Sequence, residues 1–91
     1  MTYKVLITDS AEADICRLHK YGELTALKKL NSLLSELESH PETGTGHPEP
    51  LKGDRAGQWS RRITRKHRLV YKIEEEQIIV LILSAYGHYD D

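Results

Sequence analysis

Residues 58–83, QWSRRITRKHRLVYKIEEEQIIVLIL, contain three runs that are typical of β-strands. Residues 58–64 and 67–73 are rich in β-branched and aromatic side chains, and the Arg65-Lys66 pair between them is short enough for a tight turn. Three consecutive glutamates predict the next turn. Residues 77–83 are almost entirely apolar, which indicates a buried central strand. We therefore expect this segment to form most of one sheet.

The N-terminal half predicts one strand followed by two helices. Residues 3–8 alternate and are β-branched, as in a strand. Asp9 stands three residues before Glu12, the spacing of a capping box, so we expect Asp9 to cap a helix that stops at Gly22. A second helix starts near Glu23, and its apolar stripe consists of Leu24, Leu27, Leu30, Leu34 and Leu37.

The order β-α-α-β-β-β predicts an α+β domain in which a helix hairpin packs on one face of a mostly antiparallel, twisted sheet. Ninety-one residues, of which 38% are apolar, suffice for a single domain spanning residues 1–91. One cysteine, Cys16, excludes an intrachain disulfide and fits a reducing cytoplasm. No segment resembles a signal peptide or approaches the length of a membrane span, and no motif indicates a metal or nucleotide cofactor.

The charges are distributed unevenly along the chain. Residues 51–72 contain eight basic side chains and one acidic side chain, Asp54, a balance of +7, whereas the remainder carries −8. A concentrated basic strip predicts a local site for a polyanion such as nucleic acid, although a solvated hairpin is an equally simple interpretation. The basic residues are Lys52, Arg55, Arg61, Arg62, Arg65, Lys66, Arg68 and Lys72.

The chain contains the groups that metal-free RNA cleavage needs. The 2′-hydroxyl of RNA can attack the adjacent phosphorus if a base removes its proton, cations stabilise the phosphoryl oxygens and an acid protonates the leaving 5′ oxygen. Glu49 lies between two prolines in an irregular but stiff loop and is the candidate base. His88, which follows the last strand, is the candidate acid. Simpler interpretations are a loop carboxylate paired with Lys52 or Arg55, and a bystander histidine near a terminus.

Arg61, Arg62 and Arg68 are candidates for binding a phosphate, because a guanidinium is planar and donates several hydrogen bonds. Arg61 and Arg62 are neighbours in one strand and point to opposite faces, so only one of them can share a face with Arg68. Surface ion pairs with the nearby glutamates explain these arginines equally well. In the turn, Arg65 and Lys66 are candidates for phosphate contacts that strengthen binding.

Three further side chains lie near these candidates in the sequence. Tyr86 and Tyr89 could stack on unpaired bases, the usual way in which single-stranded RNA is recognised, or could be residues of a sheet edge. His67 lies within the basic strip and is a weaker catalytic candidate than His88.

Four motifs, taken in order, resemble the Txe/YoeB toxins of bacterial toxin–antitoxin systems, which belong to the RelE group of ribosome-dependent mRNA endonucleases. The motifs are G-x-G-x-P-E-P-L-K (residues 44–52), G-x-W-S-R-R-I-T (57–64), H-R-L-V-Y (67–71) and H-Y (88–89). They cover about half of the chain, and the other half agrees with the family in length and in β-α-α order. The chain departs from the family by continuing with Asp90-Asp91 and by its more acidic overall charge.

This resemblance implies a RelE-like microbial RNase fold and a metal-independent endoribonuclease that cleaves mRNA in the ribosomal A site and inhibits translation. A cognate antitoxin of the YefM/Axe type would neutralise it, and operator DNA would be bound only through that antitoxin. The oligomeric state, a homodimer or otherwise, stays open. The resemblance assigns roles to six residues: Glu49 as general base, Arg68 as phosphate stabiliser, His88 as general acid, Tyr89 in orienting the substrate, and Lys52 and Arg62 in holding the scissile phosphate.

Two other functions remain as alternatives. One is a gyrase-inhibiting toxin of the same superfamily, which would have no need of an acid–base set. The other is a corepressor module that acts only with an antitoxin on operator DNA.

Overall fold

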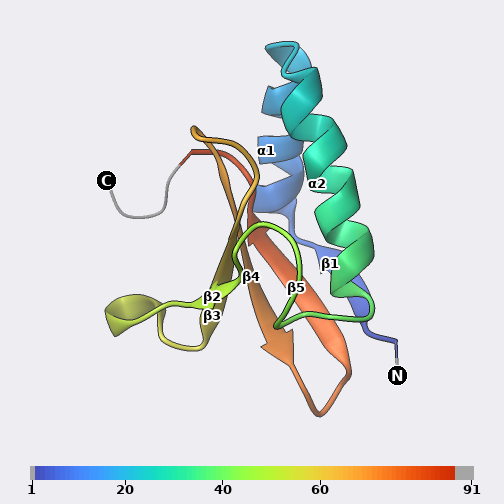
Figure 1. Ribbon diagram of the computed structural model, residues 1–91, viewed down its shortest axis with the longest axis vertical. Coiled ribbons are helices and arrows are strands. Elements are labelled where there is room, and N and C mark those ends of the chain that lie inside the picture. Colours follow the sequence, from blue (N-terminus) through green and yellow to red (C-terminus); the bar gives the residue numbers. More distant parts are fainter. Residues whose placement is uncertain (1, 88–91) are drawn as a thin grey trace.

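The computed structural model of the protein describes residues 2–87, and its elements follow the expected order with one short strand and one 3₁₀ turn added. Figure 1 shows both helices on one side of the sheet. The elements are β1 (Lys4–Ile7), α1 (Asp9–Lys20), α2 (Leu24–Leu37), β2 (Glu49–Pro50), η1 (Gly53–Arg55), β3 (Gln58–Arg62), β4 (Arg68–Glu74) and β5 (Ile79–Ser84).

The strands form one sheet in the order β1-β5-β4-β3-β2. The contacts β2–β3, β3–β4 and β4–β5 are antiparallel, and only β1 pairs in parallel, with β5. The apolar strand β5 is therefore an inner strand, as expected, and Val80 and Ile82 on it are fully buried. The predicted α+β class and the mostly antiparallel sheet are confirmed.

The helix pair covers the sheet face that carries Leu69 and Tyr71 of β4 together with Val80 and Ile82 of β5. From α2, the fully buried or nearly buried side chains are Ala26, Leu30, Leu33 and Leu37, whereas Leu27 and Leu34 are only partly buried. The expected apolar stripe is thus wrong at Leu24, which is 70% exposed in the first turn of the helix.

The first helix begins one residue earlier than expected. Thr8, in an extended conformation, is the N-cap, and its hydroxyl accepts a hydrogen bond from the Ala11 N–H. The same hydroxyl donates to the Ile82 carbonyl at 2.7 Å and so ties the helix start to β5. The prediction of Asp9 as the cap is therefore wrong, because Asp9 is already in the first turn, where its negative charge favours the helix dipole. The expected stop at Gly22 is confirmed, with the helix ending two residues earlier and Gly22 at φ +65°.

Candidate functional site

The sheet face opposite the helices brings together side chains from β2, β3 and β4. Glu49 pairs across the strands with Ser60, and Arg62 pairs with Arg68. Residues that face each other across two strands share a face, as do residues two apart in one strand. Glu49, Ser60, Arg62 and Arg68 therefore lie on one face, and Arg62 is the arginine that accompanies Arg68.

Glu49 and Arg68 form an ion pair on this face. The nearest carboxylate oxygen and guanidinium nitrogen are 4.0 Å apart, which is an ion pair beyond hydrogen-bonding distance. The Glu49 side chain is 55% exposed and that of Arg68 is 19% exposed. The carboxylate is thus open to a ligand, while the arginine is held more firmly by its surroundings.

Glu49 is carried by a strand rather than by the irregular loop predicted from Gly44 to Pro50. The two-residue strand β2 pairs at the edge of the sheet with β3, and the Leu51 N–H donates to the Gln58 carbonyl. Pro50 fits this edge because it has no N–H to donate. The carboxylate is consequently fixed relative to the arginines of β3 and β4 by the register of the sheet.

Arg61 is a correction to the set of candidate phosphate ligands. It lies on the helix-covered face opposite Leu69 and is completely buried. Its five N–H groups donate to the Tyr71 hydroxyl, the Glu36 carboxylate and the carbonyls of three loop residues, so none is left for a phosphate. The loop carbonyls belong to His40, Thr43 and Thr45.

The buried Arg61 holds the loop that precedes the strand of Glu49. The loop that it holds leads from α2 into β2, and the Arg62 N–H donates to the Gly46 carbonyl at 2.7 Å. Gly46 has φ +85°, and a Cβ there would lie 2.9 Å from the Arg62 carbonyl oxygen, so only glycine allows this approach. Arg61 and Gly46 therefore fix the path of the chain that presents Glu49.

Because Glu36 is a titratable partner of Arg61, the stability that this contact contributes depends on pH. A hydrogen bond from Thr45, followed by the charge of Arg61, lowers the pKa of Glu36 below its ordinary value of 4.5. A carboxyl whose pKa is lower in the folded state stabilises the fold above its unfolded pKa, and this contribution is lost as the pH falls through the folded pKa. We expect the difference in free energy of unfolding between the wild type and Glu36→Gln to be largest at neutral pH and to shrink as the pH falls below 4.5.

Urea denaturation from neutral pH down to about pH 3 measures this difference. Glu38→Gln, an exposed carboxylate at the end of the same helix, is the matched control. Parallel stability curves for the wild type and Glu36→Gln over the whole range would contradict the assignment.

Ser60 was not singled out from the sequence. It lies on the sheet face opposite the helices, where it pairs with Glu49 and stands two residues before Arg62, yet it is fully buried. Its hydroxyl has no hydrogen-bond partner among residues 2–87. Strand alternation from Arg62 could have placed it on this face, but nothing in the sequence indicates its burial.

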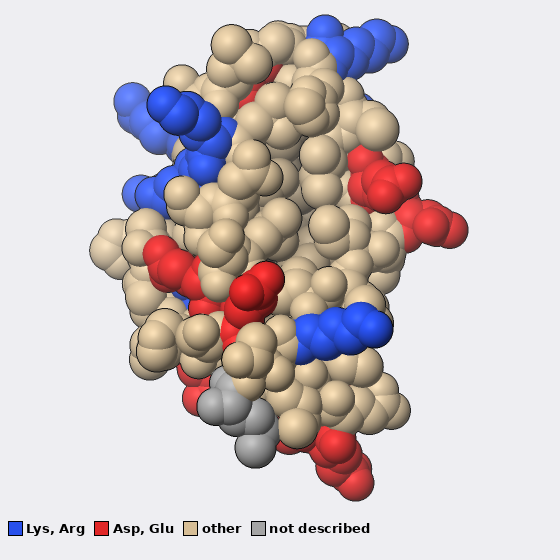
Figure 2. Space-filling model, turned by 90° about the vertical axis from the view of Figure 1, so that its right-hand side faces the viewer, with Lys and Arg blue, Asp and Glu red and all other residues tan. Residues whose placement is uncertain are grey.

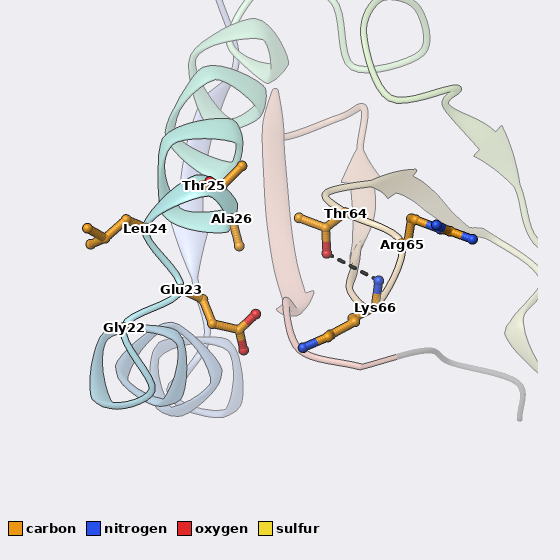
Figure 3. Close-up of a pocket in the computed structure, with 8 residues that line it drawn as sticks. All are labelled: Gly22, Glu23, Leu24, Thr25, Ala26, Thr64, Arg65 and Lys66. Atoms are coloured by element: carbon orange, nitrogen blue, oxygen red, sulfur yellow. Dashed lines mark hydrogen bonds between the residues drawn. The ribbon is translucent and has the colours of Figure 1, made fainter.

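Arg65 and Lys66 lie in the turn between β3 and β4, which closes the hairpin beyond the Arg62–Arg68 pair. They line a pocket of about 400 Å³ together with the start of α2 and Thr64. Figure 3 shows Lys66 extending toward the helix side and Arg65 pointing away from it. The pocket and the ion pair are separate features, and both turn residues are exposed, as is Lys52 beside η1.

The predicted acid His88, and Tyr89 beside it, lie outside the described residues 2–87. The chain leading to them is described through Gly87, whose carbonyl accepts a hydrogen bond from the Arg68 N–H at 2.9 Å. The last described residues therefore run beside the first residue of β4, at the same end of the strand as the Arg68 side chain.

The described residues allow three further observations. Figure 2 shows the side of the molecule at the right of Figure 1, where positive and negative side chains are interspersed. Within residues 2–87, no group of three or more His, Cys, Asp or Glu side chains is arranged to hold a metal ion. Among the helices of the same residues, none has the length and apolar character needed to cross a membrane.

These features define a small α+β domain with a carboxylate–arginine site on the sheet face opposite its helices. The family of YoeB-like toxins of bacterial type II toxin–antitoxin systems matches residues 8–89, and the chain belongs to this family. The toxin YoeB of Streptomyces coelicolor is 48% identical over 62 residues, which are 68% of this chain and 71% of the relative.

Solved structures agree over almost the whole chain. A YoeB/ParE toxin from Agrobacterium tumefaciens is 36% identical, with a TM-score of 0.86 over 94% of this chain and 99% of the other. The YoeB of Staphylococcus aureus has been solved as a dimer and in complex with YefM. Both structures are 30% identical to this chain and cover 98% of it and 100% of the other, with TM-scores of 0.81 and 0.79.

Proposed function

We propose that this toxin is a ribosome-dependent endoribonuclease that cleaves mRNA in the A site by metal-independent general acid–base catalysis. The observation that carries the proposal is the Glu49–Arg68 pair, in which an accessible carboxylate lies beside an arginine on the sheet face opposite the helices. A base next to a phosphate ligand is the arrangement that attack by a 2′-hydroxyl requires.

In the proposed reaction, Glu49 removes the proton from the 2′-hydroxyl as its oxygen forms a bond to the adjacent phosphorus. Arg68 stabilises the charge that develops on the phosphoryl oxygens, and the bond from phosphorus to the 5′ oxygen breaks. His88 donates a proton to that leaving oxygen, and Tyr89 orients the substrate. The products are a 2′,3′-cyclic phosphate and a 5′-hydroxyl, so protons and bonds balance without a co-reactant.

The neighbouring cations act on the RNA backbone. Arg62 shares the face of Arg68, and Lys52 lies two residues after the end of β2. We propose that both contact phosphates near the cleaved bond. Arg65 and Lys66 lie in the turn, farther along the hairpin, where they would contact ribosomal or messenger RNA and contribute affinity rather than rate.

The ribosome supplies what a 91-residue domain lacks, a fixed conformation of the mRNA. Holding the 2′-hydroxyl in line with the leaving oxygen can be worth roughly 7–11 kcal/mol in the best intramolecular reactions. This explains why so exposed a site would cleave RNA only on ribosomes.

We further propose that an antitoxin of the YefM type silences the protein in the cytoplasm. The S. aureus relative is described in complex with YefM, and it matches the fold of this chain over nearly its full length. An acidic, partly disordered partner would fold over the Glu49–Arg68 face and offer carboxylates to its arginines. The gyrase-inhibiting and corepressor alternatives have no use for a carboxylate placed beside an arginine.

Arginine variants separate chemistry from binding. We expect Arg68→Ala to reduce the cleavage rate of the ribosome-bound complex by roughly a hundredfold or more, because it removes a group that stabilises the transition state. We expect Arg65→Ala and Lys66→Ala to leave that rate almost unchanged and to weaken ribosome association, with a smaller dependence of affinity on salt.

The measurement is single-turnover cleavage of a transcript on programmed ribosomes, together with affinity at several salt concentrations. The proposal fails if Arg68→Ala loses affinity but keeps the rate of the bound complex. Gyrase inhibition without transcript cleavage by the wild type would favour the first alternative function.

A further inference from the structure

Three hydrogen bonds hold the backbone of residues 85–87, which directly precede His88 in the sequence. The Ala85 N–H donates to the Asp14 carboxylate at 2.9 Å. The Gly87 carbonyl accepts from the Arg68 N–H at 2.9 Å, and the Gly87 N–H donates to Nδ1 of His67 at 2.9 Å. His88, the residue proposed as general acid, follows Gly87 directly in the sequence.

The contacts of His67 fix the position of its proton. Its Nδ1 accepts a hydrogen bond from a backbone N–H, which can only donate, so Nδ1 carries no proton. The ring proton is then on Nε2, which lies 3.0 and 3.1 Å from the two carboxylate oxygens of Glu23. His67 is only 3% exposed, and Glu23 is the N-cap of α2. Figure 3 shows the Glu23 side chain reaching from the helix start toward the β3–β4 side.

Tyr86 packs beside this chain of hydrogen bonds. Its ring centroid is 4.4 Å from that of His67. On the other side, the guanidinium carbon of Arg17, a residue of α1, lies 4.3 Å from the Tyr86 centroid. Tyr86 is thus held between α1 and His67, which restricts the residue between the two anchored backbone positions Ala85 and Gly87. Gly87 has φ +74°, which a residue with a side chain adopts only with strain, so glycine suits this anchored position.

We propose that His67, oriented by Glu23, is a positioning residue for the general acid: it accepts the Gly87 N–H and so fixes the backbone from which His88 projects. This inference rests on the proposed function, in which His88 protonates the leaving oxygen. His67 itself is not available as an acid or base, because both ring nitrogens are engaged and the ring is buried. His67, the weaker catalytic candidate in the sequence, is therefore assigned a positioning role and takes no part in proton transfer.

Two substitutions of His67 by amide residues each keep one of its two hydrogen bonds and remove the other. The Asn side-chain oxygen can take the place of Nδ1, so His67→Asn keeps an acceptor for Gly87 and loses the contact with Glu23. The longer Gln side chain reaches the place of Nε2, so His67→Gln keeps the contact with Glu23 and loses the acceptor for Gly87. We expect His67→Gln to lower the cleavage rate of the bound complex about tenfold, within the loss that a 1 Å misplacement can cause, and His67→Asn to stay within about threefold of wild type. Ribosome affinity should not change for either variant.

A double-mutant cycle with His88→Ala tests whether His67 acts through the acid. If it does, His67→Gln should have almost no further effect on the rate once His88 is absent. A full tenfold loss in the His88→Ala background would overturn the proposal, because a general loss of structure reduces the rate whether or not the acid is present.

The free protein provides a readout that does not depend on cleavage. We expect ¹⁵N NMR to show an unprotonated Nδ1 and a protonated Nε2 for His67, and hydrogen exchange at the Gly87 amide to speed up in His67→Gln but not in His67→Asn. Unchanged Gly87 exchange in His67→Gln, or equal rates for wild type and His67→Gln on ribosomes, would overturn the proposal. Failure of the proposed function would look different, because the wild type itself would then not cleave the transcript.

Discussion

Replacing His88 with alanine or glutamine is expected to reduce single-turnover cleavage on ribosomes by roughly two to four decades, the range expected when a general acid is lost. The leaving 5′ oxygen would then depart as an alkoxide, or take its proton from water. Ribosome binding should change little, since the positive charges proposed to contact RNA lie just before η1, on β3 and β4, and in the turn between these two strands.

The effect of the His88 variants can be checked with an mRNA whose leaving group does not need a proton. A 5′-phosphorothiolate linkage at the cleaved position provides such a leaving group, and it should restore most of the rate of His88→Ala. Cleavage of the normal transcript by His88→Ala within a few-fold of wild type would rule out the assignment of His88 as the acid.

Replacing Arg61 with methionine is expected to cost about 3–5 kcal/mol of stability, because several buried or partly buried acceptors lose their donor at once. The Tyr71 hydroxyl, the Glu36 carboxylate and the carbonyls of residues 40, 43 and 45 would all lose a donor. The loop into β2 would also lose its attachment, so the position of Glu49 and the cleavage rate should suffer as well.

Arg62→Met, one residue further along β3, is the matched control. Its side chain is exposed on the other face, so we expect a change within about 0.5 kcal/mol. Urea denaturation of the two variants gives the comparison, with the midpoint and the m-value both recorded. Equal midpoints for Arg61→Met and Arg62→Met would show that the buried network does not support the fold.

Much of the fold follows from local patterns in the sequence. The alternation of β3 and β4 and the apolar run of β5 depend on neighbouring residues, and all three strands lie where they were expected to within one or two residues. The constraint that only one of Arg61 and Arg62 can share a face with Arg68 is also local, and the register assigns that place to Arg62.

What could not be predicted depends on partners that are distant in sequence. Arg61 is buried because Glu36 and three carbonyls between residues 40 and 45 converge on it, 16 to 25 positions away. The positioning role proposed for His67 depends on its hydrogen bonds with Glu23, 44 positions earlier, and with Gly87, 20 positions later. Charge and strand alternation predict that an arginine is exposed, and they do not predict whether a histidine is buried or exposed. The roles of Arg61 and His67 therefore become clear only from the tertiary contacts.

The smaller errors have physical causes as well. Thr8 caps α1 in place of Asp9 because its hydroxyl can bond both the helix start and the Ile82 carbonyl, and the second contact is tertiary. The strand β2 has two residues, one of them proline, and exists only because β3 offers a free edge.

The central claim, cleavage by the 2′-hydroxyl of the mRNA itself, is tested most directly by a transcript with a single 2′-deoxynucleotide on the 5′ side of the cleaved bond. On programmed ribosomes, the wild-type protein should cleave the all-ribose transcript to products with a 2′,3′-cyclic phosphate and a 5′-hydroxyl, and should leave the deoxy-substituted transcript intact at that position. Cleavage of the substituted transcript at the same bond, or products with a 5′-phosphate, would contradict the mechanism.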